Sequence, residues 1–141
     1  MSTLHPTGRR QAGVLAALVL ASGLASAQPL LDENTQHLLV EAVSAAADFD
    51  LYNARCRSDQ SGRRTDNLNK TLASKFRMTV LEVQDDFFPE GSYRRAQTRL
   101  QEEFLARLKE AGGCAGAKAA GMPAALGERY DTLIRQIERL P

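Results

Sequence analysis

The sequence has no tryptophan, only two cysteines and two histidines, and no marked excess of charge of either sign. It carries 18 basic and 17 acidic residues. A protein whose main partner is nucleic acid or an anionic membrane needs a strong basic excess. The balance therefore argues against both of these partner classes.

Motifs that carry common chemistries are also missing. The chain contains no C-x-x-C-H, no G-x-S-x-G and no C-x-x-C sequence, which argues against covalent haem attachment, a nucleophile elbow and a redox dithiol. No histidines, cysteines or paired acids have the spacing of metal ligands, so neither a metal nor a cofactor is predicted. One alternative stays open, in which His37 and either Met78 or Met122 hold haem without a covalent bond.

The first 27 residues have the pattern of a cleaved export signal. Two arginines precede an uncharged apolar run over 12–24, and Ala-Ser-Ala follows at 25–27 as a small-x-small cleavage site. The run, about 13 residues long, is shorter than the ~20 residues that a membrane-spanning helix needs. We expect cleavage after Ala27, a periplasmic or secreted mature chain over 28–141, and no stable membrane insertion after cleavage. Cleavage removes two basic residues and no acidic one, so the mature chain has a charge of about −1 at neutral pH.

The two cysteines, Cys56 and Cys114, are predicted to form one disulfide, because an exported chain folds in an oxidising compartment. The bond would close a loop of roughly 60 residues, for which chain entropy gives a stabilisation of about 4 kcal/mol.

Apolar residues recur at steps of three and four in four segments, which predicts four amphipathic helices over about 31–56, 65–87, 92–111 and 123–140. The breaks between them are a polar stretch over 57–64, the Phe88-Pro89 pair, and a glycine pair followed by a small-residue linker over 115–121.

These segments predict an all-α fold, a single helical domain over 28–141 arranged as an up-down-up-down four-helix bundle. In that order the ends of the first and third helices lie together, and Cys56 and Cys114 mark those two ends. The sequence therefore predicts a three-helix core clasped by one disulfide. The fourth helix packs either within the same chain or across a dimer, and the oligomeric state stays open.

Two charged clusters are candidate sites. Four arginines surround Cys56 and are interpreted as a solvated loop or as a patch for an anion or a partner: Arg55, Arg57, Arg63 and Arg64. Across the predicted turn at 88–92, three acids face two arginines, either as a structural ion-pair cluster or as a recognition site: Glu82, Asp85, Asp86, Arg94 and Arg95.

The leading functional hypothesis is an exported binding or interaction protein, such as an inhibitor, an immunity factor or an adaptor, with another envelope protein as its partner. A small-ligand carrier for haem, a metal or an anion is the first alternative. A small helical enzyme with an arginine-lined anion pocket is the second. No catalytic residue is predicted.

Overall fold

The computed structural model describes residues 2–3 and 30–141, so the predicted export signal lies almost entirely outside the described residues. The described part forms six helices and no strand, which confirms the all-α class. The helices are α1 (Glu33–Cys56), α2 (Arg63–Phe76), α3 (Val80–Asp86), α4 (Tyr93–Glu110), α5 (Gly113–Ala119) and α6 (Met122–Arg139).

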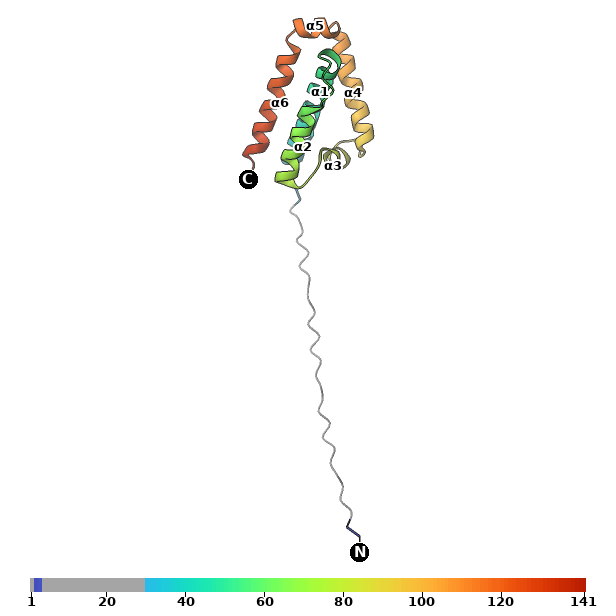
Figure 1. Ribbon diagram of the computed structural model, residues 1–141, viewed down its shortest axis with the longest axis vertical. Coiled ribbons are helices and arrows are strands. Elements are labelled where there is room, and N and C mark those ends of the chain that lie inside the picture. The colour runs from blue at the N-terminus through green and yellow to red at the C-terminus, as the bar shows by residue number, and fades with distance from the viewer. Residues whose placement is uncertain (1, 4–29) are drawn as a thin grey trace.

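The long helix α1 is the central element. It contacts α2, α3, α4 and α6, and its most extensive contact is with α6 (Figure 1). The short helix α5 bridges α4 and α6 at one end of the molecule, and α3 lies at the opposite end. Within the described residues, no helix is both long enough and apolar enough to cross a membrane.

Helix α1 begins and packs as the sequence predicts. Asp32 caps it, since the Asp32 carboxylate accepts a hydrogen bond from the Thr35 backbone N–H at 2.8 Å. The predicted apolar seam is buried at its centre, where Ala42, Ala45 and Tyr52 are each at most 2% exposed. Burying such a face supplies most of the stability of a helix in a protein.

The second predicted helix is wrong as a continuous element, because the chain breaks between α2 and α3. Arg77 adopts a left-handed backbone conformation, with φ of 53°, and ends α2. Thr79 then starts α3 through a capping box: the Glu82 N–H donates to the Thr79 hydroxyl, and the Glu82 carboxylate accepts from the Thr79 N–H. In addition, Asn69 of α2 accepts a hydrogen bond from the Val80 N–H at 2.8 Å. These bonds hold α3 at an angle to α2.

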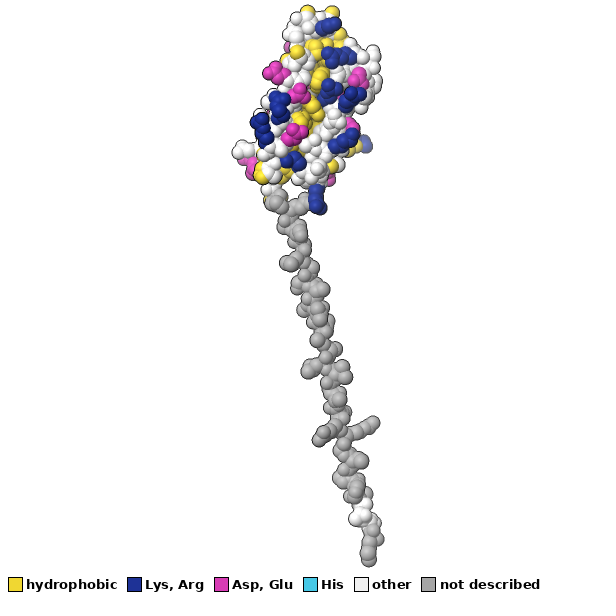
Figure 2. All heavy atoms as spheres, turned by 60° about the vertical axis from the view of Figure 1, so that its left-hand side comes forward, with side chains coloured by type: hydrophobic (Ala, Val, Ile, Leu, Met, Phe, Trp, Pro, Cys, Tyr) yellow, Lys and Arg dark blue, Asp and Glu magenta, His cyan; other side chains and the backbone are white. Residues whose placement is uncertain are grey.

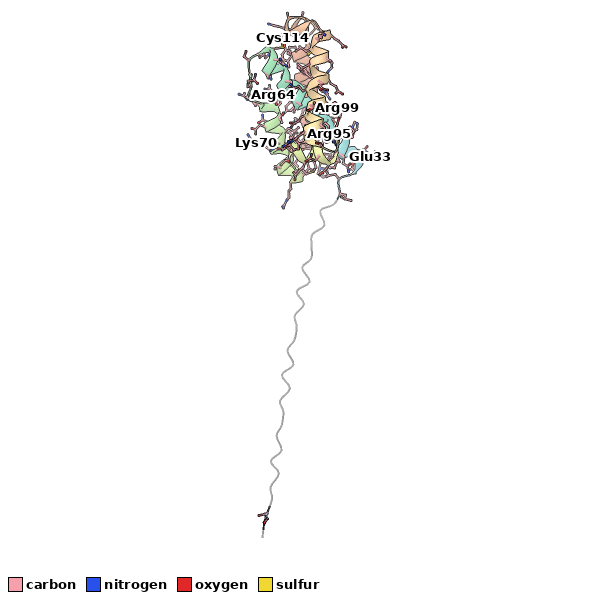
Figure 3. The ribbon with its side chains drawn as sticks, turned by 90° about the vertical axis from the view of Figure 1, so that its right-hand side faces the viewer. Glu33, Arg64, Lys70, Arg95, Arg99 and Cys114 are labelled. Atoms are coloured by element: carbon pink, nitrogen blue, oxygen red, sulfur yellow. A yellow bond between two sulfur atoms is a disulfide. The ribbon has the colours of Figure 1, made fainter. Side chains whose placement is uncertain are left out.

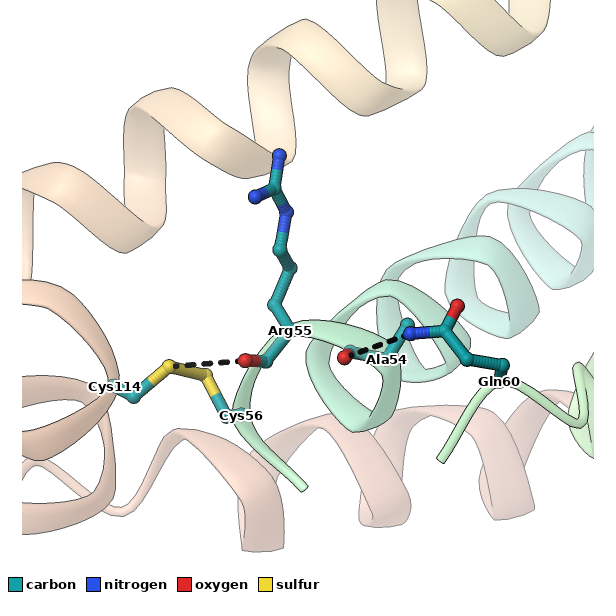
Figure 4. The surroundings of a disulfide bond; sticks show 5 residues. All are labelled: Ala54, Arg55, Cys56, Gln60 and Cys114. Carbon is teal, nitrogen blue, oxygen red and sulfur yellow. Dashed lines mark hydrogen bonds between the residues drawn. A yellow bond between two sulfur atoms is a disulfide. The ribbon is translucent and has the colours of Figure 1, made fainter. Parts of the chain in front are cut away.

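The predicted linker over 115–121 is also wrong, because α5 occupies most of it. Gly112 and Gly121 flank this short helix in the left-handed conformation that glycine adopts without strain. Cys114 lies in its first turn and forms the predicted disulfide with Cys56, with the two Cα atoms 5.4 Å apart (Figure 4). The bond therefore ties the end of α1 to α5.

We expect Gly116→Ala to destabilise the protein by about 1–3 kcal/mol, the usual cost of overpacking. A Cβ atom at this position would overlap the carbonyl oxygen of Ala111, which is backbone and cannot rotate away. The clash would push α5 away from the end of α4. Urea unfolding of this variant and of the control Ala115→Ser, at an exposed position of the same helix, measures the difference. Equal midpoints for the two variants would contradict the expectation.

Helix α6 packs against α1 of the same chain, as one of the two predicted alternatives requires. The Tyr130 hydroxyl donates to the Arg64 carbonyl at 3.1 Å, and burial raises the pKa of Tyr130. At the far end, the Lys75 ammonium donates to the Glu138 and Leu140 carbonyls at 3.1 and 2.7 Å, where a helix end favours a cation. On the side of α6, Figure 2 shows only a narrow apolar stripe bordered by charged side chains.

Candidate binding groove

In the part of the chain that the structure describes, a groove of about 730 Å³ lies over α1, between α2 and α4. Helix α3 and the connection between α1 and α2 contribute further lining residues. Figure 3 views the molecule with α4 toward the reader and α2 beside it, with Arg64 on α2 and Arg95 and Arg99 on α4.

The floor of the groove is mainly apolar. Along α1, the lining residues Val43, Ala47, Leu51 and Ala54 follow one another at steps of four, four and three, so they share one face of the helix. Val80 and Leu81 of α3 and Leu100 of α4 complete the apolar lining. Leu81 is 44% exposed, and among the described residues Leu30, which precedes α1, is the other exposed large apolar residue.

The rim is polar, and its charged members are all acidic. Asp50, Asp59 and Asp66 line the groove, and neither lysine nor arginine is among the lining residues. Amide side chains make up much of the rest of the rim, from Gln60, Asn69, Gln84, Gln97 and Gln101. Of these, Gln84 is 2% exposed and accepts a hydrogen bond from the Gln97 side chain at 3.2 Å.

Asp50 fixes the start of α2 and so one wall of the groove. Helix α2 starts at Gly62, which has no side chain to cap it. Asp50 of α1 replaces the missing cap: its two carboxylate oxygens accept hydrogen bonds from the Arg64 and Thr65 N–H groups at 3.1 and 2.8 Å. Its negative charge also suits the positive end of the helix dipole. The helix therefore begins at Arg63, two residues before the predicted start at 65.

The structure does not join the four arginines around Cys56 into one pocket. The Arg64 guanidinium lies over the Phe49 ring at 4.3 Å, and that of Arg57 over the Tyr52 ring at 5.4 Å. Arg55 and Arg63 are exposed, and the side chain of Arg55 extends toward α4 (Figure 4). None of the four lines the groove. The carbonyl of Arg55 lies 3.7 Å from Cys114 Sγ, but a disulfide sulfur has no proton to donate.

The second predicted cluster does not form ion pairs between its acids and its arginines among the described residues. Glu82 caps α3, and the Asp85 carboxylate instead accepts from the Tyr93 N–H at 2.6 Å, at the start of α4. Asp86 is exposed. The guanidinium of Arg94 donates to the Tyr93 hydroxyl at 3.1 Å, and that of Arg95 to the Glu90 carbonyl.

The ion pair near this turn is instead formed by Glu90 and Arg99. The Arg99 guanidinium lowers the pKa of the Glu90 carboxyl, and Glu90 raises the pKa of Arg99. Beside it, Arg94, Arg95 and Arg99 line a shallow hollow of about 270 Å³ on the outer face of α4. Arg94 and Arg95 are thus brought together at this hollow, and none of the three acids of the predicted cluster lines it.

The structure does not support a haem site built from His37 and Met122. His37 lies near the start of α1 and Met122 at the start of α6, at opposite ends of the molecule (Figure 1). Among the residues that the structure describes, no three His, Cys, Asp or Glu side chains are placed to hold a metal ion.

A buried charge cluster, so named because Asp48 at its centre is buried, joins α1, α4 and α6 and was missed by the sequence reasoning. The Asp48 side chain is only 4% exposed, and its Oδ2 atom is 2.7 Å from Arg107 Nη2 and 3.1 Å from Arg129 Nη1. Arg129 also pairs with Glu41 at 3.2 Å. The Oδ1 atom of Asp48 is buried and accepts no hydrogen bond from the protein. The sequence did contain a signal for this cluster, because Asp48 is an acid within the apolar seam of α1, next to Phe49.

The groove was also missed, although its floor has a signal in the sequence. Val43, Ala47, Leu51 and Ala54 form a second apolar stripe on α1, beside the seam that packs against the other helices. A second stripe predicts a further contact surface.

Comparison with protein-family models, with curated proteins and with solved structures finds no match to this chain.

Proposed function

We propose that this protein is an exported binding protein, periplasmic or secreted, that acts by holding another envelope protein in the groove between α2 and α4. The observation that carries the proposal is the groove itself, in which Ala47, Leu51 and Ala54 on one face of the central helix are only partly buried. Apolar surface of this kind marks contact sites in proteins. An inhibitor, an immunity factor or an adaptor are members of this class.

Two further observations support the exported location. The leader over 1–27 has the pattern of an export signal, and the Cys56–Cys114 disulfide suits an oxidising compartment. The enzyme alternative has less support, because the arginines on which it depends have separate contacts and lie outside the groove.

Blocking the groove tests this function. Ala47 lies on the groove floor and is half-buried, so Ala47→Phe places a ring in the space that a partner would fill. We expect the Ala47→Phe protein to capture at least tenfold less of the partner that the wild-type protein captures from the envelope extract. A tenfold loss of affinity corresponds to about 1.4 kcal/mol of binding free energy, and the blocked contacts contribute more than this. Quantitative mass spectrometry of the two captures measures the ratio.

The matched control is Ala106→Phe, at an exposed position on α4 that does not line the groove. Circular dichroism of both variants checks that the helices are retained. Equal capture by the wild-type and the Ala47→Phe proteins would contradict the proposed function.

A further inference from the structure

We propose that the occupant of the groove is a cationic amphipathic α-helix presented by the partner protein. This inference rests on the proposed function and deepens it, since it assigns a chemistry and a shape to the partner. Two observations carry it: the elongated apolar floor along α1 and the acidic rim.

The shape of the floor fits a helix. The stripe from Val43 to Ala54 covers about three turns of α1, or roughly 16 Å at 1.5 Å per residue. On α2, the lining residues Thr65 and Asn69 are four positions apart and share one face, and Asp66 lies beside them. The groove is thus an open trough parallel to α1, which suits a rod more than a compact molecule.

The groove also has the position of a missing helix. Helix α1 packs against α2 on one side and α4 on the other, while α2 and α4 have no extensive contact with each other. Ala47 and Ala54 on the floor are small, so an incoming helix can approach α1 to the 8–10 Å at which helices pack. At one end, Leu81 of α3 offers an exposed apolar side chain to it.

The acidic charges of the rim favour an occupant that is positively charged. The carboxylate of Asp50 is bound by two backbone N–H groups and that of Asp59 by the Ser61 N–H, so these bonds do not neutralise either charge. The hydrogen bonds to Ser61, and after them the positive charges of Arg63 and Arg64, lower the pKa of Asp59. Asp66 pairs with Lys70 at 2.8 Å, with both side chains at least 60% exposed. Such an exposed i,i+4 pair contributes only about 0.3–0.5 kcal/mol, so a competing cation can replace Lys70.

A helix that complements this site has apolar residues at i, i+4, i+7 and i+11 and lysine or arginine on both flanks. Binding an amphipathic helix by its apolar face in a groove is a recurrent mode of peptide recognition. The amide side chains of the rim can hydrogen bond to polar flanking residues of the occupant without requiring a charge.

The test uses three fluorescent peptides of about 14 residues, or four helical turns. The first has leucine at i, i+4, i+7 and i+11 with lysine flanks, the second replaces lysine with glutamate, and the third is a scramble of the first. Fluorescence anisotropy is measured against the full chain as recovered from expressing cells. We expect the lysine peptide alone to bind, and to bind more weakly in about 0.5 M NaCl, where screening is strong.

Variants locate the peptide. Leu81→Ser removes an apolar contact at an exposed position without adding a charge, and we expect at least tenfold weaker binding. Asp59→Asn with Asp66→Asn removes two rim charges. From the usual strength of exposed ion pairs, we expect the affinity for the lysine peptide to fall roughly five- to tenfold. The control pair, Glu128→Gln with Asp131→Asn, removes two exposed acids of α6 outside the groove and should leave binding unchanged.

Each other outcome overturns a defined part of the inference. Equal binding of the glutamate peptide rejects the cationic occupant. Binding of the lysine peptide that is unaffected by Leu81→Ser and Ala47→Phe places it outside the groove and rejects the helix. If no peptide binds while the envelope partner is still lost with Ala47→Phe, the helical occupant is rejected and the proposed function stands. A dimer that Ala47→Phe dissociates makes a second copy the occupant and rejects a different partner.

Discussion

Replacing Cys56 and Cys114 together by serine should lower the free energy of unfolding by about 4 kcal/mol. The two residues are 58 positions apart, so the bond restricts a large part of the unfolded chain. Domains of this kind have a total stability of only about 5–15 kcal/mol, so the loss is a large fraction. Urea unfolding of the double variant, with the linear extrapolation applied to each curve, measures it.

Reduction of the wild-type protein is the control for this variant. If the effect arises from the covalent link, the reduced wild-type protein and the double variant unfold at the same urea concentration. A double variant as stable as the oxidised wild-type protein would show that the link between α1 and α5 contributes nothing.

Removing both arginines of the buried charge cluster should destabilise the protein by about 3–5 kcal/mol. The double variant Arg107→Met with Arg129→Met keeps the apolar stems but leaves the Asp48 carboxylate buried without a counter-charge. Removing Asp48 instead, as Asp48→Leu, should cost less, because Arg107 and Arg129 are 47% and 36% exposed and water can solvate them. Urea unfolding compares the two.

The triple variant, which makes all three replacements, distinguishes a charge effect from lost packing. In the triple variant, apolar side chains of similar size replace the ion pairs and remove both the attraction and the cost of desolvating Asp48. We therefore expect the triple variant to recover most of the stability that the double variant loses. Arg135→Met with Arg139→Met, at two exposed positions of α6, is the matched control. A triple variant no more stable than the double variant would contradict the electrostatic explanation.

The sequence predicts the long helices well because their apolar spacing is regular. It misses the break after Phe76, because the apolar steps to Val80 and Val83 fit both a continuous helix and a second one. The deciding signal was present, since Thr79 and Glu82 have the spacing of a capping box. Helix α5 has no such signal: its composition is that of a linker, and it depends on glycine ends, the disulfide and contact with α4 and α6.

The charge pairing predicted across the turn at 88–92 differs from the structure for a related reason. Sequence proximity placed Asp85 and Arg95 at one turn, but each finds a backbone partner closer than the opposite charge. The groove depends on how far α2 and α4 diverge across α1. No residue pattern encodes that separation. The second apolar stripe of α1 does predict that a further apolar surface should pack on the stripe.

The central position of α1 has a consequence for how the chain folds. Its most extensive partner, α6, is made after all the other described helices, and the contact of Arg129 with Asp48 joins residues more than half the described chain apart. Contacts so distant in sequence slow folding, because a long loop must close before they form. During synthesis, the part of α1 that packs against α6 therefore stays uncovered until α6 has been made. The time between the synthesis of α1 and that of α6 is when this protein is most prone to aggregate and to bind chaperones.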